Sequence, residues 1–329
     1  MQKLPLSIAI GNYDRVRPLM DGAVQIDGVD PVIMNLEPEE IFFRAFRNVE
    51  FDVCELSLSS FSVKTSKNEN PYVGVPVFPS RMFRHPALYK RTDRCIDTPA
   101  DLKGKRIGLP EYQLTACVWG RIILEDYGVK PSDVTWVRGG IEEPGRIEKI
   151  SLNLPADVKL EDAPADRSLS QMLELGEIDA MLTPRAPSCF MRRDPNVGWL
   201  FPDPAAAGRE YYQRTKIFPI MHVLGVRREL VEQHSWLPVA LLKAFTEAKD
   251  IALEWLFDTA AQKVSLPFLE ETARAMTDMM GHDLWPYGFE ENRHVLDTFL
   301  HHHHAQGLSA RRLQPEDLFH PATLEMFKI

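Results

Sequence analysis

The stretch DLKGKRIG at residues 101–108 decides how this chain of 329 residues is divided. Residues 97–99, Asp-Thr-Pro, come just before it and are typical of a capped turn. The stretch leads into an apolar strand that ends near residue 109, and a helix is predicted from about 114 to 127. A capped turn, a strand and a helix in this order indicate that a new α/β unit begins here.

Upstream of that stretch, short apolar runs alternate with helical patterns. Strands are predicted at 6–10, 51–58 and 72–78, and a helix is predicted near 39–48. This alternation is typical of a sheet built from βαβ units.

Downstream, the second unit continues through a strand at 135–138, a helix at 168–175 and an apolar run at 178–182. A further strand follows at 221–226, and the rest of the chain is mainly helical. The order indicates a lobe that is interrupted by an inserted lobe.

We therefore predict an α/β fold of two lobes with a ligand cleft between them and a helical C-terminal region. The first lobe is discontinuous and takes residues 1–92 and 218–329. Residues 93–217 form the inserted second lobe.

Composition excludes several classes of protein. Hydrophobic residues make up 44% and charged residues 26%, as in folded globular proteins. The net charge is −9 and no basic block occurs, so we expect no nucleic-acid partner. No apolar run approaches the roughly 20 residues that span a bilayer, and the first residues lack a signal-peptide pattern, so we expect a cytoplasmic protein without a membrane partner.

The four cysteines are far apart in the sequence and include no CxxC pair. We expect reduced and mostly buried thiols rather than a zinc site or a disulfide framework. They are Cys54, Cys95, Cys117 and Cys189.

Two phrases resemble those of type II periplasmic binding protein folds. DLKGKRIG resembles the phrase that opens their second lobe, and LGEIDA at 175–180 resembles their helix-to-strand turn. The resemblance implies the two-lobed fold but says nothing about the ligand.

Four further stretches carry a more specific resemblance. They are IGNYDR at 10–15, FDVCELS at 51–57, PVFPSRMFRH at 76–85 and RGGIEEPGR at 138–146. Together they make nearly the whole chain similar to the 4,5-dihydroxyphthalate decarboxylase family. The resemblance implies an enzyme of phthalate degradation, a lyase that releases carbon dioxide from a catechol dicarboxylate and leaves protocatechuate.

Polar side chains follow the predicted strands of both lobes, where the loops of such a fold line the cleft. The candidates in the first lobe are Asn12, Arg15, Glu55 and Ser80, with Tyr13 beside them. The candidates in the second lobe are Glu111, Tyr112 and Thr115. Thr115 lies in the first turn of a helix, where it either helps to bind an anion or simply caps the helix.

Arginines are the natural partners of a dicarboxylate, because the guanidinium donates two parallel hydrogen bonds to a carboxylate. We predict substrate contacts for Arg81 and Arg138 first, and also for Arg84, Arg146 and Arg185. The alternative is that several of them form structural ion pairs. Residues 139–146 are rich in glycine and form either a flap that excludes water or a plain surface loop.

The chemistry requires protonation of the ring carbon that bears the leaving carboxylate, because a free aryl anion is a poor leaving species. Each carboxylate is para to one hydroxyl, so ionisation of that phenol increases the electron density at the carbon to be protonated. Histidine exchanges protons near neutral pH. We predict His85 as the first choice for proton transfer, with His222 or Glu111 as the other acid or base, and Glu55 and Tyr112 as ligands of the hydroxyls.

This mechanism needs no organic cofactor, and we predict none. A divalent metal is the chief alternative, although the chain has no HxH or HExxH pattern that would point to one. The run of histidines at 301–304 lies near the end of a predicted helix and suits the helix dipole. We expect a homo-oligomer by analogy with the family.

Two other functions fit the same fold. A non-catalytic solute-binding protein would use the cleft for a small aromatic or heterocyclic acid. A ligand-sensing regulatory domain is ranked last, because no helix-turn-helix segment precedes the first lobe and the net charge is acidic.

Overall fold

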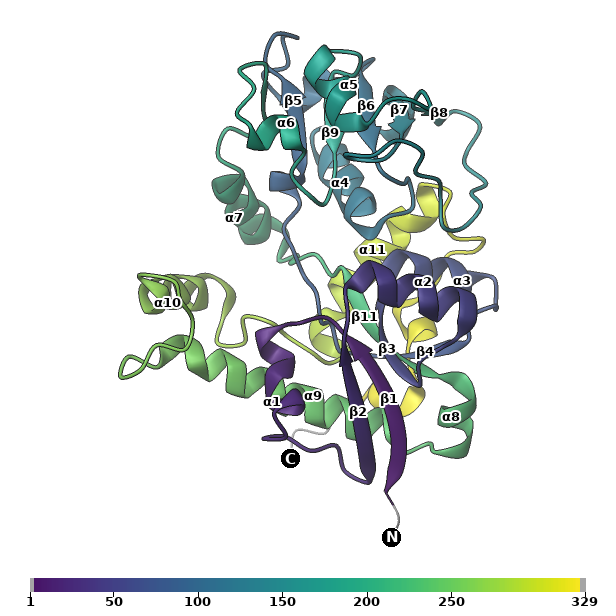
Figure 1. Ribbon diagram of the computed structural model, residues 1–329, viewed down its shortest axis with the longest axis vertical. Helices are drawn as coiled ribbons and strands as arrows, with labels where there is room; N and C mark the ends of the chain where they lie inside the picture. The colour runs from purple at the N-terminus through teal and green to yellow at the C-terminus, as the bar shows by residue number, and fades with distance from the viewer. Residues whose placement is uncertain (1–2, 326–329) are drawn as a thin grey trace.

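The computed structural model describes residues 3–325 and shows two lobes, one above the other (Figure 1). Each lobe has its own β-sheet flanked by helices. The prediction of a two-lobed α/β fold is confirmed.

The first sheet has five strands in the order β2-β1-β3-β11-β4. β1 runs parallel to β2 and β3, whereas β11 runs antiparallel to its neighbours β3 and β4. The start of β11 therefore lies at the sheet edge where β1 and β3 end. The strands are β1 (Leu4–Ile10), β2 (Val29–Asn35), β3 (Val53–Ser57), β4 (Tyr72–Val75) and β11 (His222–Arg227).

The second sheet has six strands in the order β10-β5-β9-β6-β7-β8. β9, β6, β7 and β8 are parallel, and β5 is antiparallel to β10 and β9. The strands are β5 (Leu88–Arg91), β6 (Arg106–Leu109), β7 (Thr135–Arg138), β8 (Lys159–Asp162), β9 (Ala180–Leu182) and β10 (Val197–Trp199). Because β5 belongs to this sheet, the second sheet begins at Leu88 and not after residue 92. The limits of the lobes otherwise stay a prediction.

The helices follow the expected pattern along the chain. Those before β11 are α1 (Arg17–Met20), α2 (Pro38–Asn48), α3 (Leu58–Ser66), α4 (Thr115–Asp126), α5 (Leu169–Leu175), α6 (Ser188–Met191) and α7 (Pro204–Thr215). Those after it are α8 (Arg228–Gln233), α9 (Leu237–Glu254), α10 (Leu269–Met280) and α11 (Arg293–Ala305). The C-terminal region is thus mainly helical, as predicted, and α10 projects to one side of the molecule (Figure 1).

One predicted strand is shorter than expected. β4 ends at Val75, whereas the apolar run continues to Phe78. Pro76 has no N–H group and cannot continue the hydrogen-bonded ladder. The residues after it instead form one of two linkers between the lobes.

Two linkers, residues 76–87 and 216–221, connect the lobes. An isolated antiparallel bridge joins them at Arg81 and Ile220. The amide of Met82 donates to the carbonyl of Pro219 at 3.1 Å, and the amide of Met221 donates to the carbonyl of Ser80 at 2.8 Å. These hydrogen bonds between the two linkers fix the position of the start of β11, next to the cleft.

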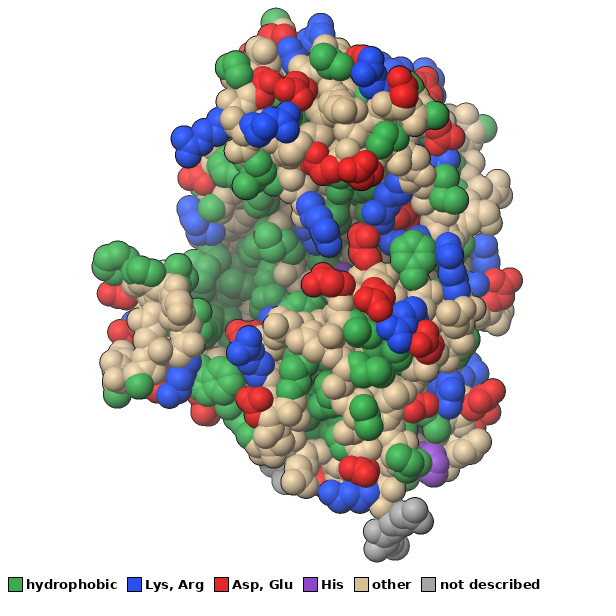
Figure 2. Space-filling view, viewed as in Figure 1, with side chains coloured by type: hydrophobic (Ala, Val, Ile, Leu, Met, Phe, Trp, Pro, Cys, Tyr) green, Lys and Arg blue, Asp and Glu red, His purple; other side chains and the backbone are tan. Residues whose placement is uncertain are grey.

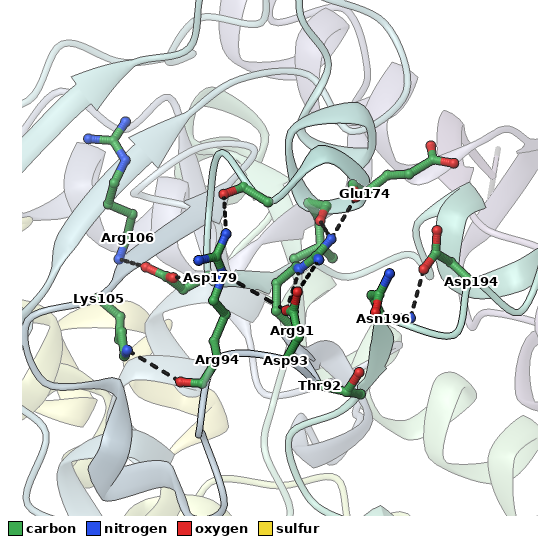
Figure 3. A network of polar contacts seen from close by, with 12 residues as sticks. Arg91, Thr92, Asp93, Arg94, Lys105, Arg106, Glu174, Asp179, Asp194 and Asn196 are labelled. Carbon is green, nitrogen blue, oxygen red and sulfur yellow. Dashed lines mark hydrogen bonds and ion pairs between the residues drawn. The ribbon is translucent and has the colours of Figure 1, made fainter.

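A polar network lies where β5 ends and β6 begins in the second sheet (Figure 3). The buried Arg91 side chain donates to the last carbonyls of α5, including that of Glu174 at 2.6 Å, and pairs with Asp93 at 2.6 Å. Gly176, with φ of 73°, then ends the helix in a left-handed conformation that glycine adopts easily. The predicted helix-to-strand turn of LGEIDA is confirmed.

Residues 3–325 include no helix that is both long and apolar enough to cross a membrane. All four cysteines are free, with Cys54, Cys117 and Cys189 buried and Cys95 exposed. The expectation of mostly buried thiols is confirmed.

Candidate functional site

A glutamate and a histidine from neighbouring strands meet at the edge of the first sheet that faces the second lobe. His222 is paired with Ser57 in the register of β11 and β3, so Glu55 is its diagonal neighbour on the same face. His222 Nδ1 lies 2.5 Å from Glu55 Oε1. Because Nδ1 is occupied by Glu55, Nε2 is the ring nitrogen that can face a ligand.

The Glu55 carboxylate is fully buried and has two further donors. The Gly11 amide donates to Oε2 at 2.9 Å, and the Tyr13 hydroxyl donates to Oε1 at 2.7 Å. Burial by itself would raise the pKa of Glu55, but His222 and the two donors together hold that pKa below its ordinary value. Glu55 is therefore an ionised carboxylate that orients the imidazole.

His222 keeps part of its surface open. Its side chain is 18% exposed, and the edge of its ring packs against Phe42 of α2, with the ring centroids 4.9 Å apart. An oriented, partly open imidazole suits a residue that moves protons to or from a bound molecule.

Arg84 contacts the residue that precedes this histidine. Its Nε donates to the sulfur of Met221, the residue before His222, at 3.1 Å. Burial lowers the pKa of Arg84 to about 10, and within residues 3–325 no carboxylate forms an ion pair with it. A half-buried guanidinium without a counter-ion is suited to bind the carboxylate of a ligand. We call Tyr13, Glu55, Arg84 and His222 the hinge site.

A large cavity lies on the α2 side of the hinge site. Phe42 contacts His222, and its neighbour Phe43 lines this cavity of about 610 Å³. We call it the flap pocket, because the predicted flap forms much of its wall. It is lined by Glu39, Phe43, Arg47, Pro110, Glu111, Leu114 and residues 140–149 and 184–186.

A smaller, apolar pocket lies on the other side. Arg15, whose guanidinium stacks on the Tyr13 ring at 4.3 Å, lines it together with Phe83, the neighbour of Arg84. Its volume is about 300 Å³, and the remaining walls come from Asp14, Phe218, Lys249, Ala252, Leu253, Leu256, Met276, Met280, Leu284 and Trp285. Figure 2 shows the surface hollowed between the lobes, with hydrophobic side chains on the floor of the hollow beside α10.

An ion-pair cluster in the flap pocket joins the two lobes. Arg146 of the flap lies 2.6 Å from the buried Glu111 of the second lobe and 3.3 Å from Glu39 of α2 in the first lobe. Lys149 lies 3.3 Å from Glu111. Burial would raise the pKa of Glu39, but Arg146, Lys149 and Arg185 together hold it below its ordinary value. This cluster holds the lobes closed over the pocket.

The flap is anchored to the second lobe at its base. Glu142 accepts a hydrogen bond from the Ser188 amide at 2.7 Å, and the Gly140 carbonyl accepts one from Leu169 at 2.8 Å. Within residues 3–325, Arg146 is the flap residue that forms an ion pair with the first lobe.

Two other residues of the flap pocket bear on chemistry. Arg185 is exposed on its wall, and no ion pair with it occurs in the described part of the chain. Burial raises the pKa of Glu148 to about 7, although the Tyr112 and Gln113 amides both donate to its carboxylate. Glu148 was missed in the sequence because it lies in an irregular loop, where spacing gives no signal.

His85 does not lie at the hinge site, which corrects its selection as the first proton-transfer residue. It is only 1% exposed, and its ring packs edge-on against Phe201 and Tyr211, with centroids 5.0 and 5.4 Å away. Among the described residues neither ring nitrogen has a hydrogen-bond partner, and burial lowers the pKa of His85 to about 4. It is a neutral core residue.

Arg81 and Tyr112 are also buried. The Arg81 guanidinium is buried and donates to the carbonyls of Phe218 and Pro286 at 2.9 and 2.7 Å, and to the side chain of Asn292. Tyr112 is fully buried in the second lobe, with the Arg121 guanidinium 3.7 Å from its ring centroid. Internal acceptors occupy the Arg81 guanidinium, which gives it a structural role, whereas the buried Tyr112 hydroxyl has no hydrogen-bond partner among the described residues, and its predicted contact with the substrate stays a prediction.

The remaining candidates lie in several places, and the half-buried Arg138 also comes within 3.8 Å of Glu148 in the flap pocket. Arg138 pairs with Asp162, with Nε 2.8 Å from Oδ1, and the Thr115 hydroxyl accepts from the Ser59 amide at 3.0 Å, which ties α4 to the first lobe. Arg15 donates to the Pro79 carbonyl at 2.7 Å, Ser80 holds the start of β11 through its carbonyl, and Asn12 is exposed at the end of β1. Their roles in substrate binding stay predictions.

No group of three His, Cys, Asp or Glu side chains within residues 3–325 is arranged to hold a metal ion. That the protein needs no cofactor stays a prediction, with a divalent metal as the alternative.

Comparisons with known proteins bear on the family and the fold. A family model described as NMT1/THI5 like matches residues 84–145. The chain is 63% identical to a 4,5-dihydroxyphthalate decarboxylase of Comamonas testosteroni over 330 aligned residues, which cover 100% of both chains. It is also 63% identical to a Pseudomonas putida protein of the same name over 65% of this chain and 83% of the relative.

Among solved structures, the periplasmic aliphatic sulphonate binding protein SsuA from Escherichia coli is similar with a TM-score of 0.55 and 13% identity. The match covers 98% of this chain and 99% of that chain. At this identity the likeness concerns the fold alone, and it agrees with the two lobes and their cleft.

Proposed function

The chain belongs to the 4,5-dihydroxyphthalate decarboxylase family, which makes it a decarboxylase of 4,5-dihydroxyphthalate, and from this premise we propose that the hinge site carries out the reaction. The high identity over the full chain does not favour the alternative of a non-catalytic solute-binding protein. The observation that carries the proposal is the contact of His222 Nδ1 with the buried Glu55 carboxylate, 2.5 Å away. Arg84, which contacts the preceding residue Met221, forms no ion pair within residues 3–325.

In the proposed reaction, Arg84 binds one carboxylate of the substrate dianion by charge-assisted hydrogen bonds. Protonated His222, oriented through Nδ1 by Glu55, donates the proton on Nε2 to the ring carbon that bears the leaving carboxylate. The C–C bond to that carboxylate then breaks, and its electron pair restores the aromatic ring. The dianion and one proton become carbon dioxide and the protocatechuate monoanion, and His222 recovers its proton from water.

Glu148 is the proposed proton acceptor on the hydroxyl side. It lines the flap pocket, and its pKa near 7 lets it exchange a proton near neutral pH. Removal of the phenolic proton para to the leaving carboxylate increases the electron density at the carbon to be protonated. Glu148 returns this proton to the phenolate oxygen once carbon dioxide has left and the ring is aromatic again.

The flap pocket excludes water while the ring is non-aromatic. Arg146 closes it by pairing with both lobes, and Arg185 adds a cation for an incoming dicarboxylate. On this proposal the protein is a carboxy-lyase that needs neither an organic cofactor nor a metal.

The test is to mix purified, chelator-treated protein with 4,5-dihydroxyphthalate and to measure carbon dioxide release with identification of the aromatic product. Stoichiometric protocatechuate supports the proposal. Binding without turnover, even after divalent metal is restored, contradicts it and favours a binding protein. Activity only after metal is restored contradicts the metal-free mechanism.

We also propose a cytoplasmic location and a homo-oligomeric state. Free thiols that are mostly buried fit a reducing compartment. Cell fractionation and light scattering of the purified protein test the two proposals, and a periplasmic or a strictly monomeric protein contradicts them.

A further inference from the structure

Tyr13 lies folded back over the backbone of Gly11. A methyl group added at Gly11 would come within 2.8 Å of the tyrosine ring, closer than two such groups can pack. The absence of a side chain at position 11 therefore lets the ring lie against the chain and brings its hydroxyl to Glu55. Gly11 also donates its own amide to the same carboxylate.

The hydroxyl of Tyr13 and the imidazole of His222 share a single oxygen of Glu55. Tyr13 donates to Oε1 at 2.7 Å, and His222 Nδ1 lies 2.5 Å from the same atom, while Gly11 occupies Oε2. The strength of the contact between Glu55 and His222 thus depends on whether Tyr13 is in place.

We propose that Tyr13 is a positioning residue of the decarboxylation, which acts through Glu55 and keeps this carboxylate ionised and aligned for His222. The inference rests on the function proposed for the hinge site. Tyr13 need not touch the substrate, because its effect passes through the shared oxygen.

The state of Tyr13 is the same throughout the working pH range. Burial, and after it the charge of Glu55, raise the pKa of Tyr13 far above neutrality, so its hydroxyl stays a donor. The bond from this hydroxyl is one of the contacts that lower the pKa of Glu55. Its loss should therefore raise that pKa.

The other groups that face this pair do not titrate near neutral pH. The Arg15 guanidinium is stacked on the Tyr13 ring, 4.3 Å from its centroid. Tyr287, which senses the charge of Glu55, and Cys54, the residue before it, are buried, and burial raises the pKa of both. Ser80, the other side chain that contacts the Tyr13 hydroxyl, carries no charge. Glu148, with a pKa of about 7, forms no hydrogen bond with Tyr13 among the described residues. A difference between the pH profiles of the wild type and a Tyr13 variant can therefore be traced to Glu55 and His222.

The experiment compares the pH dependence of kcat for the wild type and Tyr13→Phe. The variant should lose about tenfold in kcat with KM nearly unchanged, because it weakens acid–base help and not substrate binding. The acid limb of its profile should move up by about one pH unit, because Glu55 loses a donor that favours its ionised form.

Tyr72→Phe is the matched control. The Tyr72 hydroxyl is also buried in the first lobe and donates to the Phe51 carbonyl at 3.1 Å, but it does not contact Glu55. This variant should lose some thermal stability and keep the wild-type kcat and pH profile.

A wild-type pH profile in folded Tyr13→Phe overturns the inference, and so does an equal shift in Tyr72→Phe. If Tyr13→Phe does not fold, Gly11→Ala carries the same test, because its methyl group displaces the Tyr13 ring. If neither the wild type nor Tyr72→Phe releases carbon dioxide, the failure lies with the proposed function and not with Tyr13.

Discussion

Glu55 in the hinge site and Glu111 in the flap pocket are both buried carboxylates at the cleft, yet their partners are of opposite kinds. Glu55 is bound by an imidazole, a phenol and an amide, whereas Glu111 is bound by a guanidinium and an ammonium group. An imidazole exchanges protons near neutral pH, but a guanidinium keeps its charge. The difference assigns proton transfer to the first region and closure of the lobes to the second.

The largest effect is expected from His222→Asn, which keeps a side-chain donor near Glu55 but cannot carry a proton. kcat should fall by about 10² to 10⁴-fold, the usual contribution of a general acid or base. The measurement is carbon dioxide release at saturating substrate, with a thermal melt to confirm folding. A loss of less than about fivefold in the folded variant would remove His222 from the mechanism.

His85 offers a second comparison with His222. Its ring nitrogens have no hydrogen-bond partner among the described residues, so His85 should affect stability alone. Its pKa is near 4 in the folded chain against about 6.5 when unfolded, so below pH 6.5 the unfolded chain binds more protons. Stability is then fully present above pH 6.5 and is lost as the pH falls toward 4, by about 3 kcal/mol.

Urea unfolding at several pH values checks this expectation. His85→Phe should flatten the decline between pH 6.5 and 4 and keep kcat within about twofold. The buried His303, whose pKa is lowered to about 3, should leave part of the acid sensitivity in place. A loss of activity comparable to that of His222→Asn would restore His85 as a catalytic candidate.

Arg84→Met tests whether the hinge site also binds the carboxylate. The loss of charge-assisted hydrogen bonds worth about 1.5–3 kcal/mol should raise KM by about 10- to 150-fold. Lys at the same position should recover part of the affinity. If KM is unchanged, the substrate carboxylate is bound elsewhere, and Arg185 becomes the next candidate.

The smallest effect is expected from Glu39→Gln, which removes only the contact of Arg146 across the lobes. Glu39 is partly exposed and the contact is 3.3 Å long, so the loss should be about 0.2–1 kcal/mol and weaken further in salt. kcat/KM should fall by a few-fold at low ionic strength and approach the wild type at 1 M salt. A loss that is independent of salt would show that Glu39 contacts the substrate.

Much of the fold could be predicted from local sequence. The capped turn and strand around residues 101–108 marked the inserted lobe, and the return to a strand near 221 placed the start of β11 at the cleft. Glu55 and His222 were found as candidates because each lies at the relevant end of a strand.

The sequence did not reveal the surroundings of Arg81 and His85, because their contacts come from residues far along the chain. The acceptors of Arg81 lie 137 to 211 residues away, and Phe201 and Tyr211, which enclose His85, lie in the region that follows the second sheet's parallel strands. Burial and pairing of this kind depend on tertiary contacts, and no local pattern reports them. The order Gly11-Asn12-Tyr13 holds a weak signal for the role of Tyr13, since a glycine two residues before an aromatic ring permits close packing.

The most direct test is the pH profile of kcat for Glu55→Gln and Glu111→Gln, measured side by side. Glu55→Gln should lose at least about 10²-fold in kcat, because the carboxylate that orients His222 is gone. Glu111→Gln should keep the shape of the profile and change mainly KM and thermal stability. The reverse result, a large loss of kcat in Glu111→Gln and a near-normal Glu55→Gln, would contradict the assignment of proton transfer to the hinge site.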